Sequence, residues 1–297
     1  MKKIVFLISL LIISNLNSQA SIDCNSNLSI FAEYYKVKNY DAAYKPWMSV
    51  RKECPKINPA IYFQGTRMLE IFIKKSDGES KIAYQEDLLR LYDEWLINFP
   101  AYNGRSIVGQ IMSNKAQKMI DYKLATKSEI YDLFENAYQT DPVSFDDPKP
   151  LYSYFKTYFE LYKAGKSEIT LNQIFNKYEE LSERYNSIID EYSKQIDVII
   201  NKESSGIALT SREKRNKRVY EINSNASNIY LRNLNAIIAK ESTCENLIPL
   251  YRKNLEENKT NPLWLNRAAS RMDSKECSDD PLFVVLVELL HNLNLSY

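Results

Sequence analysis

Residues 24–55 read CNSNLSIFAEYYKVKNYDAAYKPWMSVRKECP, a stretch enclosed by two cysteines. Its apolar and aromatic side chains recur at helical spacing in two short runs, which predicts two helices with a turn near the middle. In an antiparallel helical hairpin, the start of the first helix lies beside the end of the second. Cysteines at these two ends can be bridged without strain, so we expect a Cys24–Cys54 disulfide.

A second stretch, residues 244–277, repeats this arrangement. Lys52-Glu53-Cys54 recurs as Lys275-Glu276-Cys277, and the enclosing cysteines are 30 and 33 positions apart in the two stretches. Four cysteines allow three pairings, and the hairpin argument favours Cys24–Cys54 and Cys244–Cys277. Zinc is the competing interpretation, but the chain has no Cys-x-x-Cys and its single histidine is His291.

A period just above 30 residues is typical of helix–turn–helix repeats. We compare the segment with a tetratricopeptide repeat of about 34 residues by placing Cys24 at its first position. At five positions the repeat has, in order, an aromatic, an aromatic, an alanine, an aromatic and a proline. The segment has Tyr34, Tyr40, Ala43, Trp47 and Pro55 there. The segment therefore resembles the exported tetratricopeptide-repeat (TPR) proteins of Gram-negative bacteria. It departs from the pattern at Phe31, where the repeat has a small residue.

This resemblance implies an all-α solenoid of helical hairpins. Ala43 would let two helices approach, while Tyr40 and Trp47 would fill the groove between hairpins. The likeness is looser over residues 58–142 and partial over 151–165 and 244–277. Gly65 and Gly109 lie inside predicted helices, where glycine costs about 1 kcal/mol, so we expect close helix contacts there. An irregular helical bundle is the alternative.

Residues 168–241 interrupt the repeats with two long heptad patterns. The first contains neither Gly nor Pro and is followed by the breaker Ser204-Ser205-Gly206; the second begins at Thr210 or Ser211. We predict an antiparallel coiled-coil hairpin, with two ordinary long repeat helices as the alternative. The first seam contains Ile174, Tyr178, Leu181, Tyr185, Ile188 and Tyr192, and the second contains Val219, Ile222, Ala226, Ile229, Tyr230, Leu234 and Ile237.

The start of the chain carries an export signal. Lys2 and Lys3 precede an apolar run over residues 4–13, and Ser18-Gln19-Ala20 offers a cleavage site, which predicts a signal peptide over 1–20. A buried first helix is the alternative. We expect TPR-like repeats over 21–167, the coiled-coil hairpin over 168–241, and a last TPR-like hairpin with an apolar capping helix over 242–297. Export to the periplasm or the medium would let disulfides persist.

The composition excludes several classes of protein. Of 297 residues, 39 are Lys or Arg and 38 are Asp or Glu, so the formal net charge of +1 gives no general attraction to nucleic acid. Only 6 glycines are present, which argues against β-sandwiches and glycine-rich phosphate loops. No later segment is long and apolar enough for a membrane span. We expect no cofactor and no metal.

One basic segment is a candidate partner-binding site. Residues 212–218 contain five cations at the expected end of the hairpin: Arg212, Lys214, Arg215, Lys217 and Arg218. A solvated coiled-coil end would look the same, but these charges could bind an acidic protein or anionic head groups. In a TPR stack the concave groove would also include Tyr35, although tyrosines at helical spacing more often belong to the core.

Catalytic patterns are sparse. Glu203-Ser204 resembles the catalytic pair of lytic transglycosylases, but the rest of that motif is absent. The acidic pairs before Pro148 and Pro281 precede helices, where we expect capping. We therefore expect an exported, non-catalytic scaffold for protein–protein interactions in the cell envelope. The alternatives are a helical enzyme that cleaves peptidoglycan or other glycans, and a membrane-surface adaptor that uses the basic segment.

Overall fold

A computed structural model describes residues 23–165 and 168–295, and the regular secondary structure of this range is almost entirely helical. The predicted signal peptide at 1–20 lies outside the described residues. Packing divides the chain into two compact units, one up to Leu91 and one from Tyr92 onward. The predicted boundaries after residues 167 and 241 both fall within the second unit.

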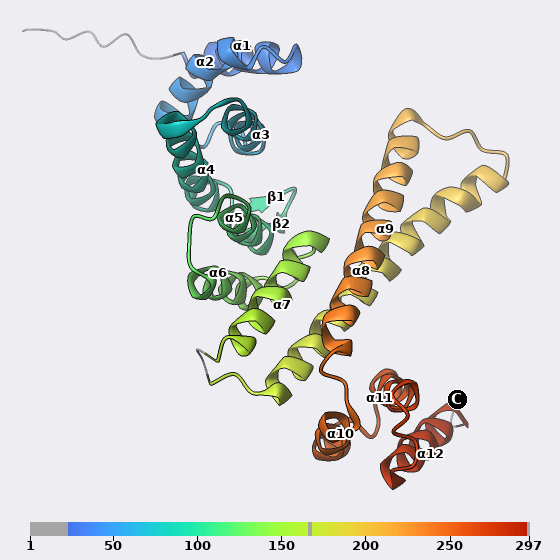
Figure 1. Cartoon of the computed structure of the whole chain (residues 1–297). Helices are drawn as coiled ribbons and strands as arrows, with labels where there is room; N and C mark the ends of the chain where they lie inside the picture. The colour runs from blue at the N-terminus through green and yellow to red at the C-terminus, as the bar shows by residue number, and fades with distance from the viewer. Residues whose placement is uncertain (1–22, 166–167, 296–297) are drawn as a thin grey trace, which may run out of the picture. The chain divides into compact units, whose positions relative to one another are not determined.

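The first unit begins with two helical hairpins (Figure 1). Its helices are α1 (Cys24–Lys36), α2 (Tyr40–Glu53), α3 (Ala60–Lys75) and the first part of α4 (Gly78–Asn98). Asp23 caps α1 by accepting the backbone N–H groups of Asn25 and Ser26, each at 3.1 Å. The Cys24–Cys54 bridge joins the open ends of α1 and α2, and the Cα atoms of the two cysteines lie 6.2 Å apart. The all-α prediction is confirmed here, together with the predicted pairing of neighbouring helices in hairpins.

Trp47 and Ala43 are fully buried on α2, while Tyr34 on α1 is 39% exposed. The Tyr34 side chain is therefore more exposed than expected for a residue that packs between repeat helices. Phe31, at the position where the repeat pattern has a small residue, is fully buried instead, so α1 turns a different side chain toward α2. Pro55 follows α2, and its carbonyl accepts the Tyr62 hydroxyl at 3.0 Å.

The second unit starts with a short β-ribbon and three helices. After the end of α4 come β1 (Ala101–Tyr102) and β2 (Arg105–Ser106), which pair antiparallel. The helices are α5 (Val108–Tyr122), α6 (Lys127–Thr140) and α7 (Pro148–Lys163). Gly109 lies where α5 meets the backbone after α6, since a Cβ there would collide with the Asp141 carbonyl. The predicted close contact at this glycine is confirmed.

Two long helices follow, α8 (Leu171–Ser204) and α9 (Ser211–Ala239). They fold back on each other, and their connecting loop is well separated from α7 (Figure 1). Both start with a capping box, in which Thr170 pairs with Gln173 and Thr210 pairs with Glu213. The predicted breaker and the predicted Thr210 start are thus observed.

The first part of the predicted α9 seam, Val219 to Ile229, is shifted by one residue, whereas Leu234 in its last part is fully buried as predicted. Val219, Ile222 and Ile229 are 45%, 55% and 48% exposed. Tyr220 instead stacks on Tyr192 of α8 with ring centroids 5.9 Å apart, and Ser227 is fully buried. Apolar spacing alone led to the wrong register, because α8 offers an aromatic ring with a hydroxyl that favours Tyr220 and Asn223. The Asn223 amide donates to the Tyr192 hydroxyl at 3.2 Å.

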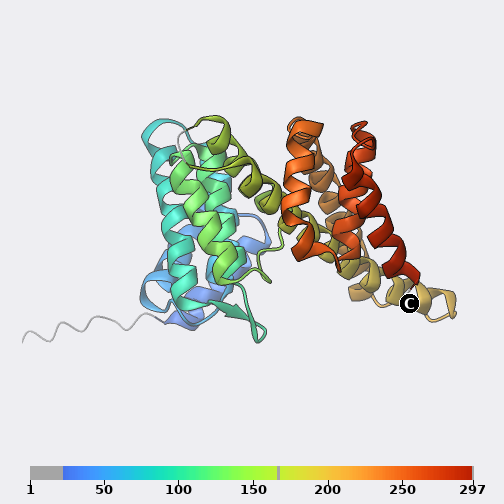
Figure 2. The ribbon, with the colours of Figure 1, turned by 90° about the horizontal axis from the view of Figure 1, so that it is seen from below.

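Three helices complete the second unit: α10 (Cys244–Asn258), α11 (Pro262–Ser274) and α12 (Pro281–Leu295). They lie side by side in Figures 1 and 2. The Cys244–Cys277 bridge joins the start of α10 to the residue after the turn that ends α11, with Cα atoms 5.4 Å apart. Both predicted disulfides are therefore present in the structure. The apolar helix α12 buries Leu282 and Leu286.

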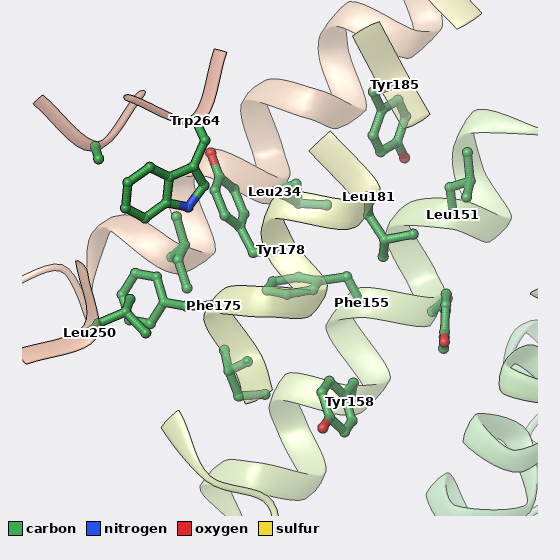
Figure 3. Packing of buried hydrophobic residues seen from close by; sticks show 14 of the residues in the cluster. Leu151, Phe155, Tyr158, Phe175, Tyr178, Leu181, Tyr185, Leu234, Leu250 and Trp264 are labelled. Atoms are coloured by element: carbon green, nitrogen blue, oxygen red, sulfur yellow. The ribbon is translucent and has the colours of Figure 1, made fainter. Parts of the chain in front are cut away.

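The core of the second unit is centred on the first half of α8. Side chains from α7, α8, α9, α10 and α11 meet there in one cluster (Figure 3). Ion pairs surround it: Glu179 of α8 binds Arg267 at 2.9 Å and Arg271 at 3.0 Å, and Arg271 also donates to the Tyr251 hydroxyl at 2.8 Å. Because the guanidinium of Arg271 lies 4.6 Å from the Tyr178 ring, α8 holds α11 by both charge and ring contacts.

Candidate partner-binding surfaces

The end of the α8–α9 hairpin is ordered by two cross-helix ion pairs. Lys202 of α8 binds Glu213 of α9 at 2.5 Å, and Lys217 of α9 binds Glu203 of α8 at 2.6 Å. The hydrogen bond from Lys202, together with those from Thr210, lowers the pKa of Glu213 to about 2. These contacts use the two acidic residues nearest the loop and only one of the five predicted tip cations.

The other four tip cations have no ion-pair partner among the described residues. Arg212, Lys214, Arg215 and Arg218 are all exposed. They lie in the first turns of α9, where the helix dipole already carries partial positive charge. We call this set, with Lys217, the basic tip. Its uncompensated charge makes it a ready site for an external anionic group.

A second feature lies on the same helix. Val219, Ile222, Ala226 and Ile229 form an apolar row on α9, and we call it the outer row. Tyr220 and Asn223 of α9 both contact Tyr192 of α8, so the outer row occupies a neighbouring face. Its three large side chains are about half exposed. A half-exposed apolar row at heptad spacing is a typical protein-contact surface.

A groove lies among α5, α6 and α7, with Tyr230 of α9 at its edge. Its volume is about 440 Å³. Four lysines line it, and two carboxylates form ion pairs with three of them: Asp121 binds Lys149 at 2.8 Å, and Glu160 binds Lys127 at 2.6 Å and Lys156 at 3.9 Å. Lys123 has no ion pair among the described residues. The groove therefore carries a net positive charge, and no feature of the sequence had pointed to it.

Tyr35, the predicted groove residue of the first repeat, lies between two other rings. Its ring centroid is 5.9 Å from that of Phe31 and 5.6 Å from that of Tyr40, both edge to face. These contacts hold the α1–α2 turn together, and the side chain is only partly exposed. A binding role for Tyr35 stays a prediction.

The acidic pairs before Pro148 and Pro281 differ from each other. Asp280 accepts the Leu282 backbone N–H at 2.9 Å, as expected for a capping residue. Asp147 makes no capping hydrogen bond and instead accepts the Asn114 amide at 2.7 Å, so the capping prediction is wrong for Asp147. The preceding α6–α7 loop turns this carboxylate toward α5. Its neighbour Asp146 is mostly buried, which raises its pKa to about 6.

A tyrosine and glutamate cluster between α6, α7 and α8 was also missed from the sequence. Glu135 accepts the hydroxyls of Tyr131, at 2.8 Å, and Tyr154. Lys177 of α8 lies 3.7 Å from Glu135 and 5.3 Å from the Tyr154 ring. Burial raises the pKa of Tyr154 far above its usual value, and the Glu135 carboxylate adds to this. The cluster anchors the hairpin to the preceding helices; only the abundance of tyrosine hinted at it.

The remaining residues that were considered for catalysis or metal binding do not lie together. Glu203 lies at the exposed hairpin end in its ion pair with Lys217, and His291 is exposed on α12. Within residues 23–165 and 168–295, no group of three or more His, Cys, Asp or Glu side chains is arranged to hold a metal ion. No helix in the same part of the chain combines the length and the apolar character needed to cross a membrane.

Comparison with known proteins gives no relative. No family description, no curated protein and no solved structure matches the chain.

Proposed function

We propose that this chain is an exported, non-catalytic, TPR-like scaffold that binds protein partners in the cell envelope through its α8–α9 hairpin. The observation that carries the proposal is the basic tip, where four exposed cations have no ion-pair partner in the described chain. Glu213 and Glu203, the two acidic residues nearest the loop, are already paired with Lys202 and Lys217. The remaining charge is thus available for a partner with an acidic surface.

The helical hairpins support a scaffold of the solenoid type. Stacked helix pairs present extended surfaces and contact mainly their neighbours, which suits recognition of other proteins. The TPR resemblance of residues 24–55 extends this argument to the family level. Trp47 and Ala43, two of its motif residues, are fully buried between helices as the repeat would require.

Export is supported by the sequence and is compatible with the disulfides. Lys2, Lys3 and the apolar run over 4–13 fit a secretory signal. Both cysteine pairs are bridged in the structure, and such bridges persist in oxidising compartments. An envelope location would place the basic tip among exported proteins.

Site-specific photo-crosslinking in the producing cells tests the proposal. A photoreactive amino acid at Lys214 is expected to yield adducts of defined mass with one or a few proteins. Neutralising the four unpaired cations should abolish these adducts: Arg212→Gln, Lys214→Gln, Arg215→Gln and Arg218→Gln, with the photoreactive group moved to Ser211. Absence of any protein adduct in the unaltered chain would refute the proposal.

A matched control removes the same amount of charge elsewhere. Four exposed lysines of the first unit, which make no ion pair among the described residues, can be changed to glutamine: Lys36, Lys38, Lys74 and Lys75. Crosslinking at the tip should survive this change. Flotation with anionic vesicles addresses the membrane-adaptor alternative, because vesicle binding that depends on the tip cations without any protein adduct would favour lipid as the ligand.

A further inference from the structure

The outer row of α9 continues along the helix in both directions. With steps of 3 and 4 residues it runs through Arg212, Arg215, Val219, Ile222, Ala226, Ile229, Asn233 and Ala236. Residues at these steps share one helix face. All eight side chains are exposed or partly exposed. The face is basic at its first end, apolar in the middle, and small or polar at its far end.

This face is separate from the contacts that α9 makes within the chain, which are with α8 and with α7. On the α7 side, Tyr230 of α9 packs on Tyr152 with ring centroids 5.5 Å apart. The α8-facing side carries the Tyr220–Tyr192 ring stack and the Asn223–Tyr192 hydrogen bond. Tyr178 of α8 donates its hydroxyl to Asn235 of α9 at 2.8 Å. A helix with two heptad faces is what assemblies of three or more helices contain, with each face packed on a different neighbour.

We propose that the extended outer row docks an acidic amphipathic α-helix of a partner protein, which packs along α9 beside its contacts with α8 and α7. This inference rests on the proposed function, since it specifies the partner of the same hairpin. The docked helix would place apolar residues against Val219, Ile222 and Ile229. It would place carboxylates one turn further on, against Arg212 and Arg215.

The positive charge of the extended outer row favours an acidic partner. The eight residues of this row include two arginines and no acidic residue. The flanking positions at the same heptad spacing add Arg218 and Arg232, again without an acidic residue. None of these arginines has an ion pair in the part of the chain that the structure describes. Partner carboxylates along the helix flank would therefore meet only unpaired arginines.

The same charges disfavour a second copy of this chain as the occupant. In an antiparallel pairing that aligns Val219 with Ile229 of the other copy, Arg218 would face Arg232 at both ends of the contact. In a parallel pairing, Arg212 and Arg215 would each face their own counterparts. Like charges across a helix interface destabilise it, so a helix of opposite charge is the better fit.

The test uses two synthetic helical peptides and the full chain. Each peptide has four heptads with leucine at the a and d positions; the acidic probe has glutamate at e and g, and the basic probe has lysine there. Fluorescence anisotropy measures binding at low and high ionic strength. We expect the acidic probe to bind, more weakly at high salt, and the basic probe to bind at least tenfold more weakly than the acidic one.

Variants at exposed positions locate the contact. Ile222→Asp should weaken binding of the acidic probe at least tenfold, and Arg215→Glu should weaken it while reducing its dependence on salt. Ile82→Asp is the matched control, because Ile82 is a helical isoleucine of the first unit with 53% exposure against 55% for Ile222. Circular dichroism checks that every variant is folded.

Four outcomes would overturn the inference: equal binding of both probes, unchanged binding by Ile222→Asp, an equal loss with Ile82→Asp, or a chain dimer that Ile222→Asp dissociates in sedimentation. Vesicles of phosphatidylglycerol that bind the chain through Ile222 more tightly than the acidic probe does would also overturn it, in favour of a lipid surface. Protein adducts at Lys214 that persist in Ile222→Asp would remove helix docking while leaving the proposed function intact.

Discussion

The indole ring of Trp47 lies directly against the backbone of Gly65. The Trp47 Nε1–H donates to the carbonyl of Ile61 at 2.8 Å, which fixes the ring over the first turns of α3. A Cβ added at residue 65 would lie 2.7 Å from the indole Cζ2 atom. The contact explains why a helix otherwise rich in large apolar residues contains a glycine at this point.

Gly65→Ala is therefore expected to destabilise the first unit. Overpacking against a fixed indole costs about 1–3 kcal/mol, and the gain in helix propensity returns about 1 kcal/mol of that. We expect a net loss of up to about 2 kcal/mol, measured by urea unfolding followed through tryptophan fluorescence and far-UV circular dichroism.

A double-mutant cycle with Trp47→Phe provides the control. The smaller ring leaves room at residue 65, so Gly65→Ala should cost less in the Trp47→Phe background than in the unaltered chain. Additive losses would show that the glycine is needed for a reason other than this ring.

Each disulfide should protect mainly the hairpin that it closes. In the chain-entropy model, a loop of about 30 residues gives a stabilisation of about 3.5 kcal/mol. Replacing Cys24 and Cys54 with serine is expected to speed amide hydrogen exchange in α1 and α2. Exchange in α10 and α11 should stay unchanged, because the two bridges lie in different compact units.

The reciprocal variant, with serine at Cys244 and Cys277, serves as the control and should reverse the pattern. Peptide mapping without reduction checks the pairing itself. A peptide that joins Cys54 to Cys244 would contradict both the sequence argument and the structure.

Local features of the fold were accessible from sequence because they depend on neighbours along the chain. The Cys24–Cys54 and Cys244–Cys277 pairs and the Thr210 cap follow from spacing within one hairpin, and the close contacts at Gly65 and Gly109 follow from the cost of glycine inside a helix. The Glu135 cluster and the α5–α7 groove join side chains from three or more helices. No short-range pattern specifies how those helices meet, so the sequence alone could not locate them.

The buried carboxyl of Asp146 should make stability depend on pH. Burial, with a contribution from the negative charge of Asp147, raises its pKa from 3.8 to about 6. Below about pH 4 the group is protonated in both the folded and the unfolded chain. Between about 4 and 6 only the folded chain holds the proton, so this group makes stability fall as pH rises through that window.

Asp146→Asn removes this titration. At pH 7.5 the variant is expected to be more stable than the unaltered chain by about 1–3 kcal/mol. The difference should shrink toward zero as the pH falls below about 4, as measured by chemical unfolding across the pH range. Asp132→Asn, at an exposed carboxyl on α6, is the control and should show no such pH-dependent gain.

The register of α9 gives the sharpest test of the hairpin. A seam through Val219, Ile222 and Ile229 follows apolar spacing, while the structure places Tyr220 and Asn223 against Tyr192 of α8 and buries Ser227. The two registers differ by one residue, or about 100° of helix rotation. Sequence could not decide between them, because the deciding contacts are a ring stack and a hydrogen bond to Tyr192.

Alanine substitutions separate the two registers. Leu234→Ala removes a fully buried side chain and should cost about 2–4 kcal/mol of unfolding free energy. Ile229→Ala, at a side chain that is 48% exposed, should change it by less than about 0.5 kcal/mol. Tyr220→Ala should lie between these values, because it removes one ring of a partly exposed stack. Comparable losses for Ile229→Ala and Leu234→Ala would mean that the apolar seam, rather than the Tyr192 contacts, sets how α9 packs on α8.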